Sequence, residues 1–220
     1  MEFANRMQAG RLLAKKLDGY ANRSDVVVLA LPRGGVPVAF EVAQALNAPL
    51  DVFLVRKLGV PGHEELAMGA IATGGVRVMN KYVVQSLGIS DQLIDNVAAR
   101  EQHELERRER LYRGSKKLLD LAGRIVIVVD DGLATGSTMT AAVDAIKRMK
   151  PAEIVVAAPV ASDEACALFN ALVDSTCVCV MSPEPFEAVG RWYNDFRQTT
   201  DAEVCHLLKH SKKVPRKHAA

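Results

Sequence analysis

The sequence predicts an α/β fold, an open parallel sheet with helices on both faces. Apolar runs rich in β-branched residues occupy 25–31, 126–129 and 152–159, and a helical segment follows each of them. The runs are apolar throughout rather than alternating, which is typical of strands buried on both faces of a parallel sheet. Strands that alternate with helices along the chain favour the same fold class.

The amino-terminal half starts with a strand at 25–31 and a helix that runs to about Leu46. A second strand is expected from Asp51 to Lys57. It leads into the glycine-bearing stretch 58–75, which has room for a short hairpin. We therefore expect two strands of the main sheet, followed by a long, glycine-rich connection.

A long charged helix is expected from Ser90 to Leu121, with Ser90 as its amino-terminal cap and an end near Gly123. It contains three acid-first pairs at four-residue spacing, Glu104–Arg108, Glu106–Arg110 and Glu109–Arg113. An interrupted apolar stripe allows two interpretations. The helix either lies solvated against the sheet or serves as a dimerisation arm, which would make the protein a homodimer.

The carboxyl-terminal half continues the strand–helix order. A helix is expected at about 138–149, strands at 152–159 and 175–181, and a helix at 163–172 capped by Ser162. Cys177 and Cys179 fall on one face of the last of these strands. Their spacing matches no paired zinc motif, so we expect small core residues rather than metal ligands.

Composition limits the classes of function. A chain of 220 residues with 49% hydrophobic residues fits a single domain over 1–208, followed by a basic, flexible tail at 209–220. The net charge of +2 gives no broad basic field for nucleic acid. No apolar run is long enough for a membrane span and the polar start is no secretory signal, so we expect a cytoplasmic protein without a membrane partner.

The most informative segment is 126–138, Val-Ile-Val-Val-Asp-Asp-Gly-Leu-Ala-Thr-Gly-Ser-Thr. A buried strand delivers Asp130 and Asp131 to its carboxyl end, and a helix starts near Thr138. The amino terminus of a helix carries free N–H groups and partial positive charge, so it favours phosphate. Two acids beside a phosphate site suit a ligand with hydroxyls or Mg²⁺, such as a sugar phosphate. A generic strand–helix turn explains the acids but not the Thr-Gly-Ser-Thr run.

This segment resembles the motif of the type I phosphoribosyltransferases, which bind 5-phosphoribosyl-1-pyrophosphate (PRPP). The resemblance covers about 25–182. It implies that Asp130 and Asp131 hold the ribose hydroxyls, and also Mg²⁺ directly or through water. It further implies a phosphate loop formed by Ala134, Thr135, Gly136, Ser137 and Thr138. Loops for nucleoside triphosphates or dinucleotides need glycine patterns that this chain lacks.

A second loop follows the first strand, Pro32-Arg33-Gly34-Gly35. The Arg33 guanidinium has the fork geometry that clasps a pyrophosphate, and the two glycines permit close approach of the backbone. In the resembled family the corresponding loop binds pyrophosphate, often through a strained or cis peptide. The resemblance therefore implies a pyrophosphate site at Arg33, Gly34 and Gly35.

Arg56 and Lys57 end the strand before the glycine-bearing stretch. The resemblance implies that this stretch is the flexible catalytic loop, which closes over PRPP and excludes water. The Arg-Lys pair is most similar to the adenine-type enzymes, where it approaches the pyrophosphate. Lys57 alone could equally be a solvated surface cation. Glu64 and Glu65 on the same loop are the candidates for a general base.

The resemblance also implies a small hood over the acceptor base, formed by the chain segments 1–20 and 183–208. Phe186, Trp192 and Tyr193 lie in the second segment, and they either stack on a base or form the hydrophobic core of the hood. Ala134 stands where the hypoxanthine/guanine enzymes have an Asp. This makes a 6-oxopurine acceptor less favoured than in those enzymes.

The implied reaction is the Mg²⁺-dependent transfer of ribose 5-phosphate from PRPP to a small nitrogenous base, with release of pyrophosphate. Asp130 and Asp131 would orient the ribose, while Arg33, Arg56 and Lys57 would stabilise the leaving group. Two other activities stay open. The chain could be a regulator that binds PRPP or a nucleotide without turnover, or a hydrolase of PRPP or a nucleotide.

Overall fold

The computed structural model describes residues 2–172 and 177–211. Its main layer is a five-stranded parallel sheet in the order β2-β1-β6-β7-β8, which confirms the predicted fold class. The strands are β1 (Val26–Ala30), β2 (Leu50–Val52), β6 (Ile125–Val129), β7 (Glu153–Val160) and β8 (Cys177–Met181). The first two residues of the strand expected at 175–181, and most of the expected tail, lie outside the described residues.

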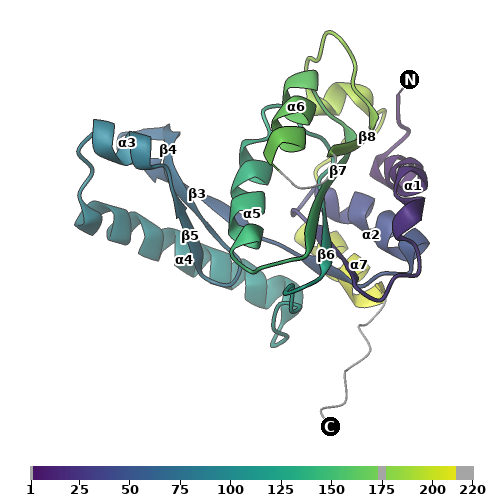
Figure 1. Ribbon diagram of the computed structural model, residues 1–220, viewed down its shortest axis with the longest axis horizontal. Coiled ribbons are helices and arrows are strands. Elements are labelled where there is room, and N and C mark those ends of the chain that lie inside the picture. Colours follow the sequence, from purple (N-terminus) through teal and green to yellow (C-terminus); the bar gives the residue numbers. More distant parts are fainter. Residues whose placement is uncertain (1, 173–176, 212–220) are drawn as a thin grey trace.

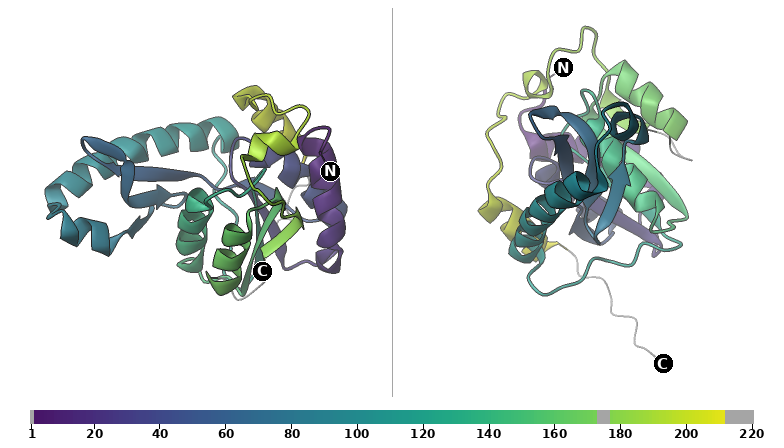
Figure 2. Two further views of the ribbon diagram at one scale, coloured as in Figure 1. Left: turned by 90° about the horizontal axis from the view of Figure 1, so that it is seen from above. Right: turned by 90° about the vertical axis from the view of Figure 1, so that its left-hand side faces the viewer.

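Helices cover both faces of this sheet because β1 and β6 are apolar on both sides. Val26, Val28 and Ala30 face a cluster shared with α1 (Arg6–Lys16), α2 (Gly35–Leu46) and α7 (Asp201–His210). Val27 and Leu29 face the cluster under α5 (Ser137–Lys147) and α6 (Asp163–Leu172). Figures 1 and 2 show these two helical layers on either side of the strands.

A second, three-stranded antiparallel sheet projects from the body as an arm (Figure 1). It contains β3 (Val55–Val60), β4 (His63–Ala72) and β5 (Val76–Met79), and the arm also carries α3 (Lys81–Ser86). The expected single strand at 51–57 was wrong. The chain leaves the parallel sheet after Val52 and enters the antiparallel one at Val55, so one apolar run serves two sheets.

The long helix α4 (Asp91–Arg113) lies along the arm sheet rather than the main sheet. Ser90 caps it as predicted, with the Leu93 N–H donating to its hydroxyl at 3.3 Å. Its predicted end was wrong, because the helix stops at Gly114, where φ is +63°. Residues 115–121 are not helical. Oligomeric state stays a prediction.

The carboxyl end of α4 is anchored to the parallel sheet. The Arg113 side chain is 7% exposed, and its Nε donates to Asp51 Oδ1 of β2 at 2.8 Å. The same guanidinium donates to the Val52 carbonyl and to Glu109. The remaining predicted helix pairs form at 2.8 Å (Glu104–Arg108) and 3.9 Å (Glu106–Arg110). The buried Arg113–Asp51 pair therefore ties the arm to the body.

The segments near the two chain ends meet beside the sheet. Phe3 and Tyr193 form a parallel bridge, and their rings lie 5.3 Å apart. They belong to a small apolar cluster with Ala9 and Val160, against which Val189 and Trp192 of the turn η2 (Val189–Trp192) pack. This cluster brings together the two segments expected to form the hood. The other short turn, η1 (Asp18–Tyr20), lies beside α1 and α2.

Two further expectations concern the remaining residues. Cys166, Cys177 and Cys179 are free thiols that contribute to the cluster under α5 and α6, in keeping with a packing role. Among the described residues, no helix combines the length and apolar character that a membrane crossing requires.

Candidate active site

The two predicted ligand loops lie side by side because β1 and β6 are neighbours in the parallel sheet. The chain bends sharply after β1, with a cis peptide bond between Pro32 and Arg33. Gly34 then approaches the acid pair so closely that a Cβ atom there would stand 2.0 Å from Asp131 Oδ2. The glycine is required by this approach and not by its φ of −59°. The structure thus brings together the Arg33 loop and the two acids.

Asp130 and Asp131 follow β6 directly, and both are partly buried. The Asp131 N–H donates to Asp130 Oδ1 at 2.8 Å, which fixes the first carboxylate against the backbone. Burial and the negative charge of Asp131 raise the pKa of Asp130 well above its ordinary value. The fold therefore holds two carboxylates together at a cost that a bound ligand or cation would relieve.

Arg6 of α1 forms an ion pair with the second of these acids. The sequence analysis did not identify this residue as part of the site. Its Nε donates to Asp131 Oδ2 at 2.8 Å, and the two side chains are only 11% and 16% exposed. The contact spans 125 positions, so no local pattern in the sequence pointed to it. Its only sequence signal is a basic residue at the start of the amphipathic amino-terminal segment.

The predicted phosphate loop runs from Ala134 to the first turn of α5. Gly136 is the residue before the helix and has φ +69°, a conformation that favours glycine. Thr135 Oγ1 and Ser137 Oγ lie 3.1 Å apart, and the Ser162 hydroxyl donates to the Ala134 carbonyl at 2.8 Å. The side chains at 134, 135, 137 and 138 are exposed. The result is an open helix terminus lined with hydroxyls, which suits a phosphate.

Arg33 is half-buried. Its Nη1 lies 3.9 Å from Asp201 Oδ1 at the start of α7. The same Asp201 oxygen accepts a hydrogen bond of 2.6 Å from the Tyr112 hydroxyl of α4. Burial, followed by this bond, raises the pKa of Tyr112. Among the residues that the structure describes, the Arg33 side chain thus has one long, weak contact, which leaves its guanidinium available to an anion.

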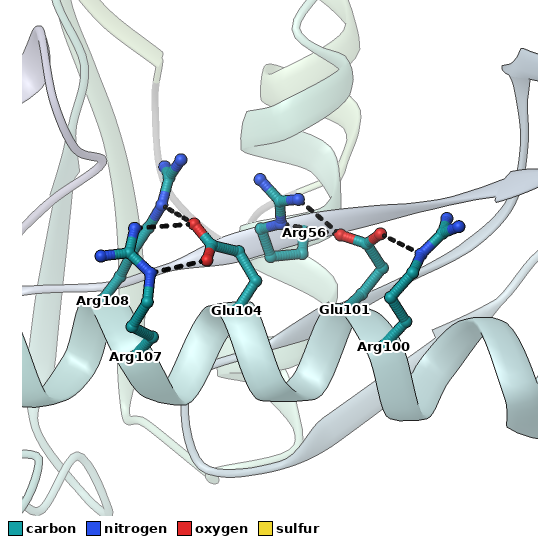
Figure 3. A network of polar contacts seen from close by, with 6 residues as sticks. All are labelled: Arg56, Arg100, Glu101, Glu104, Arg107 and Arg108. Atoms are coloured by element: carbon teal, nitrogen blue, oxygen red, sulfur yellow. Dashed lines mark hydrogen bonds and ion pairs between the residues drawn. The ribbon is translucent and has the colours of Figure 1, made fainter.

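Arg56 and Lys57 point to opposite faces of the arm sheet, as neighbours in a strand do. Arg56 faces α4, where its Nη2 donates to Glu101 Oε2 at 2.6 Å (Figure 3). Arg100 Nε also donates to Glu101, at 3.2 Å. The nearby Glu104 accepts hydrogen bonds from Arg107 and Arg108, each at 2.8 Å. Hydrogen bonds from the last two lower the pKa of Glu104 to about 2. Arg56 is therefore engaged in holding the arm together.

Lys57 faces a cavity of about 370 Å³ between the arm sheet and α5. Ser137 and Thr138 of the phosphate loop line the same cavity, together with Asp144. The Lys57 ammonium lies 3.3 Å from the fully exposed Glu65 carboxylate. Of the two adjacent cations on β3, Lys57 is thus the one that shares a cavity with the phosphate loop.

The three predicted aromatic residues lie in different surroundings. Tyr193 is buried, and its hydroxyl donates to the Asp131 carbonyl at 2.5 Å. Trp192 is half-buried, and its indole N–H is the single buried side-chain donor among the described residues that lacks a partner. Phe186 packs at the edge of the same apolar cluster. Tyr193 thus contacts the acid motif itself, while Trp192 and Phe186 belong to the cluster around it.

Glu64 and Glu65 are exposed on β4. Hydrogen bonds from the Glu64 and Gly62 backbone lower the pKa of Glu64, which makes its carboxylate a weaker base. Among the described residues, no three His, Cys, Asp or Glu side chains gather to hold a metal by themselves. Asp130 and Asp131 alone still fit Mg²⁺ that arrives with a diphosphate, because this ion uses few carboxylates and keeps phosphate and water ligands.

Three features lie at the carboxyl edge of one parallel sheet. They are the phosphate loop at the start of α5, the glycine-rich loop that carries Arg33, and the pair of acids Asp130 and Asp131. Ligands of open α/β sheets bind at this edge. The arrangement defines a protein of the phosphoribosyltransferase class. Residues 3–180 match the family model described as "Phosphoribosyl transferase domain", and the chain belongs to this family.

Relatives support the same assignment. Two proteins from Mycobacterium tuberculosis strains, provisionally named phosphoribosyl transferases Rv0571c and MT0597, are 46% identical over 94% of this chain. The chain spans about half the length of these curated relatives, since the match covers 46% of each. The crystal structure of TT1426 from Thermus thermophilus is 41% identical and superposes with a TM-score of 0.84. That match covers 97% of this chain and 100% of TT1426.

Proposed function

We propose that this protein transfers ribose 5-phosphate from PRPP to a small nitrogenous base and releases pyrophosphate. The observation that carries the proposal is the approach of Gly34 to Asp131, which puts an arginine-bearing loop against the acid pair. A 5-phosphate site alone would need only the loop before α5. A site for pyrophosphate beside one for ribose calls for both loops together.

Each part of the site has a role that its chemistry supports. The N–H groups and hydroxyls of Thr135, Ser137 and Thr138 would hold the 5-phosphate. Asp130 and Asp131 would accept hydrogen bonds from the ribose hydroxyls and favour positive charge on the sugar. Mg²⁺, when bound at these acids with the diphosphate, would neutralise charge on the leaving group.

The cations would act on the pyrophosphate. Arg33 is half-buried and has one contact of 3.9 Å, so its donors are available. Lys57 shares a cavity with Ser137 and Thr138, and movement of the arm sheet would bring it to the ligand. Arg56 would act through the arm, because Glu101 already binds its guanidinium.

The acceptor would lie under the hood. The η2 turn covers the loop after the acids so closely that a Cβ on Gly132 would meet Val189 at 2.3 Å. Ala134 leaves that position without a carboxylate for a purine ring, so we expect a base other than a 6-oxopurine. Glu64 and Glu65 stay candidates for the general base only if the arm moves them toward the sugar.

The test is to incubate the protein with PRPP, Mg²⁺ and a panel of nucleobases, and to follow pyrophosphate release. Release that depends on one base supports the transferase. Release without any base indicates a hydrolase, and PRPP binding without release indicates a regulator. The Asp130→Asn/Asp131→Asn variant serves as the site control, because full PRPP affinity in it would contradict the proposed site.

A further inference from the structure

We propose that Arg6 is a positioning residue for the ribose site, which fixes the Asp131 carboxylate so that one of its oxygens faces the sugar. The inference rests on the proposed function and extends it to a residue outside both ligand loops. Arg6 lies on α1, far from the Asp-Asp motif in sequence, yet its Nε is 2.8 Å from Asp131 Oδ2.

An ion pair, a hydrogen bond and cation–π contacts hold the Arg6 guanidinium in one place. Besides the Asp131 bond, its Nη1 donates to the Arg197 carbonyl at 2.7 Å. Its Cζ lies 3.9 Å from the centre of the Phe196 ring, within the range of a cation–π contact. With 11% of the side chain exposed, the group is immobilised before any ligand binds.

The two oxygens of the Asp131 carboxylate have different surroundings. Oδ2 accepts a hydrogen bond from Arg6, and it lies so close to Gly34 that a Cβ on that glycine would be 2.0 Å away. Within 2–172 and 177–211, no hydrogen-bond donor is paired with Oδ1. One oxygen is thus committed to the protein, and the other is left for a ribose hydroxyl.

The same contacts connect the acid to the hood. Arg197 and Phe196 follow η2, and Tyr193 donates its hydroxyl to the Asp131 carbonyl. The aromatic rings of Tyr193 and Phe196 lie 5.0 Å apart, so they form one support behind the arginine. A change at Arg6 therefore alters the orientation of Asp131, while the phosphate loop before α5 keeps its own hydrogen bonds.

The chain offers a matched control on the same helix. Arg11 is also on α1, but it pairs with Glu41 of α2 at 3.0 Å and its side chain is 59% exposed. Removing Arg11 deletes a surface ion pair between α1 and α2. Such pairs contribute little to stability. A loss of affinity shared by the Arg6 and Arg11 variants would reflect a change in α1 itself rather than in the ribose site.

Calorimetry would measure the affinities of ribose 5-phosphate, and of inorganic phosphate as a probe of the phosphate loop alone, for the wild type, Arg6→Met, Arg6→Lys and Arg11→Met. We expect Arg6→Met to lose at least about tenfold in affinity for ribose 5-phosphate, with less than a twofold change for inorganic phosphate. Arg6→Lys keeps the charge but not the paired contacts, so its loss should be smaller. Arg11→Met should match the wild type.

The outcomes separate the two proposals. Wild-type affinity for ribose 5-phosphate in Arg6→Met would overturn the positioning role and leave the proposed function standing. Equal losses for both ligands would also overturn it, because they indicate a general structural effect. A wild type that binds neither ribose 5-phosphate nor PRPP would instead overturn the proposed function. Should Arg6→Met fail to fold, a selective loss in Arg6→Lys still decides the question.

Discussion

Arg56 and Lys57 are consecutive residues of β3 whose side chains serve opposite faces of the arm. Arg56 binds Glu101 of α4 at 2.6 Å, whereas Lys57 lines the cavity that Ser137 and Thr138 also line. The Glu101 side chain is 12% exposed, so its charge depends on Arg56 and Arg100 for compensation. Two adjacent cations thus have separable roles.

The first prediction follows from this separation. Arg56→Met leaves Glu101 short of a partner and should lower the free energy of unfolding by about 1–3 kcal/mol. Its melting temperature should fall by about 2–4 °C for each kcal/mol. Lys57→Met should keep the melting temperature and raise the KM for PRPP by about tenfold, as for loss of a charged hydrogen bond. Thermal melts and initial rates of both variants check this. A reversed pattern would contradict the assigned roles.

The second prediction concerns the close approach of Gly34. Ala at this position has a permitted backbone conformation, but its Cβ would stand 2.0 Å from Asp131 Oδ2 and 3.3 Å from Arg6 Nε. Since Arg6 fixes that carboxylate, relief requires a shift of the loop, which costs about 1–3 kcal/mol. We expect Gly34→Ala to bind PRPP at least about tenfold more weakly.

Gly19→Ala is the control for Gly34→Ala, because a Cβ at Gly19 meets no atom within 4 Å. Calorimetric titration with PRPP and a thermal melt of both variants decide the matter. Normal PRPP affinity in Gly34→Ala would show that the two loops need not be this close for binding.

Local patterns were sufficient for the sheet and the acid motif because both depend on consecutive residues. The apolar run 126–129 determines its own burial, and Asp130 and Asp131 follow from its register. The same reasoning failed for residues 51–57, a single apolar run that contributes to two different sheets. Nothing between Val52 and Val55 marks the change of sheet, and the helix expected to end near Gly123 ends at Gly114 instead. Tertiary packing decided both points.

Arg6 shows the other limit of sequence reasoning. Its partner lies 125 positions away, and its contact with Asp131 exists only because α1 and the segment after η2 pack together. The motif alone therefore identifies candidate ligand residues but not the residues that hold them in place.

The third prediction concerns the three neighbouring thiols. Cys166 Sγ lies 3.8 Å from Cys179 Sγ and 4.0 Å from Cys177 Sγ. Burial and the nearby Cys166 raise the pKa of Cys179 to about 11. The thiolate is the reactive form, so Cys179 should be labelled slowly by a thiol reagent at pH 7. Its rate should rise about tenfold per pH unit up to pH 9, as measured by mass spectrometry of the labelled peptide. A rate independent of pH would refute this.

The last prediction uses the stability cost of the acid pair. Burial and Asp131 raise the pKa of Asp130 above its unfolded value of about 3.9, so the folded state binds the proton more tightly. The folded protein therefore loses stability relative to the unfolded chain as pH rises from about 4 through the folded pKa. Asp130→Asn removes the ionisation and should raise the melting temperature at pH 7.5 by at least about 2 °C, equivalent to roughly 1 kcal/mol.

The gain from Asp130→Asn should shrink as the pH falls toward 4, because the wild-type carboxyl then becomes protonated in the folded state and the cost of its ionisation there disappears. Melting curves of the wild type and the variant between pH 4 and 8 provide the measurement. Asp144→Asn is the control, since it replaces an acid at the α5 cavity outside this pair and should give no such pH-dependent gain. A destabilised Asp130→Asn at neutral pH would mean that the ionised carboxylate supports the fold. A stabilised variant that binds PRPP poorly would mean that Asp130 serves ligand binding at the expense of the protein's stability.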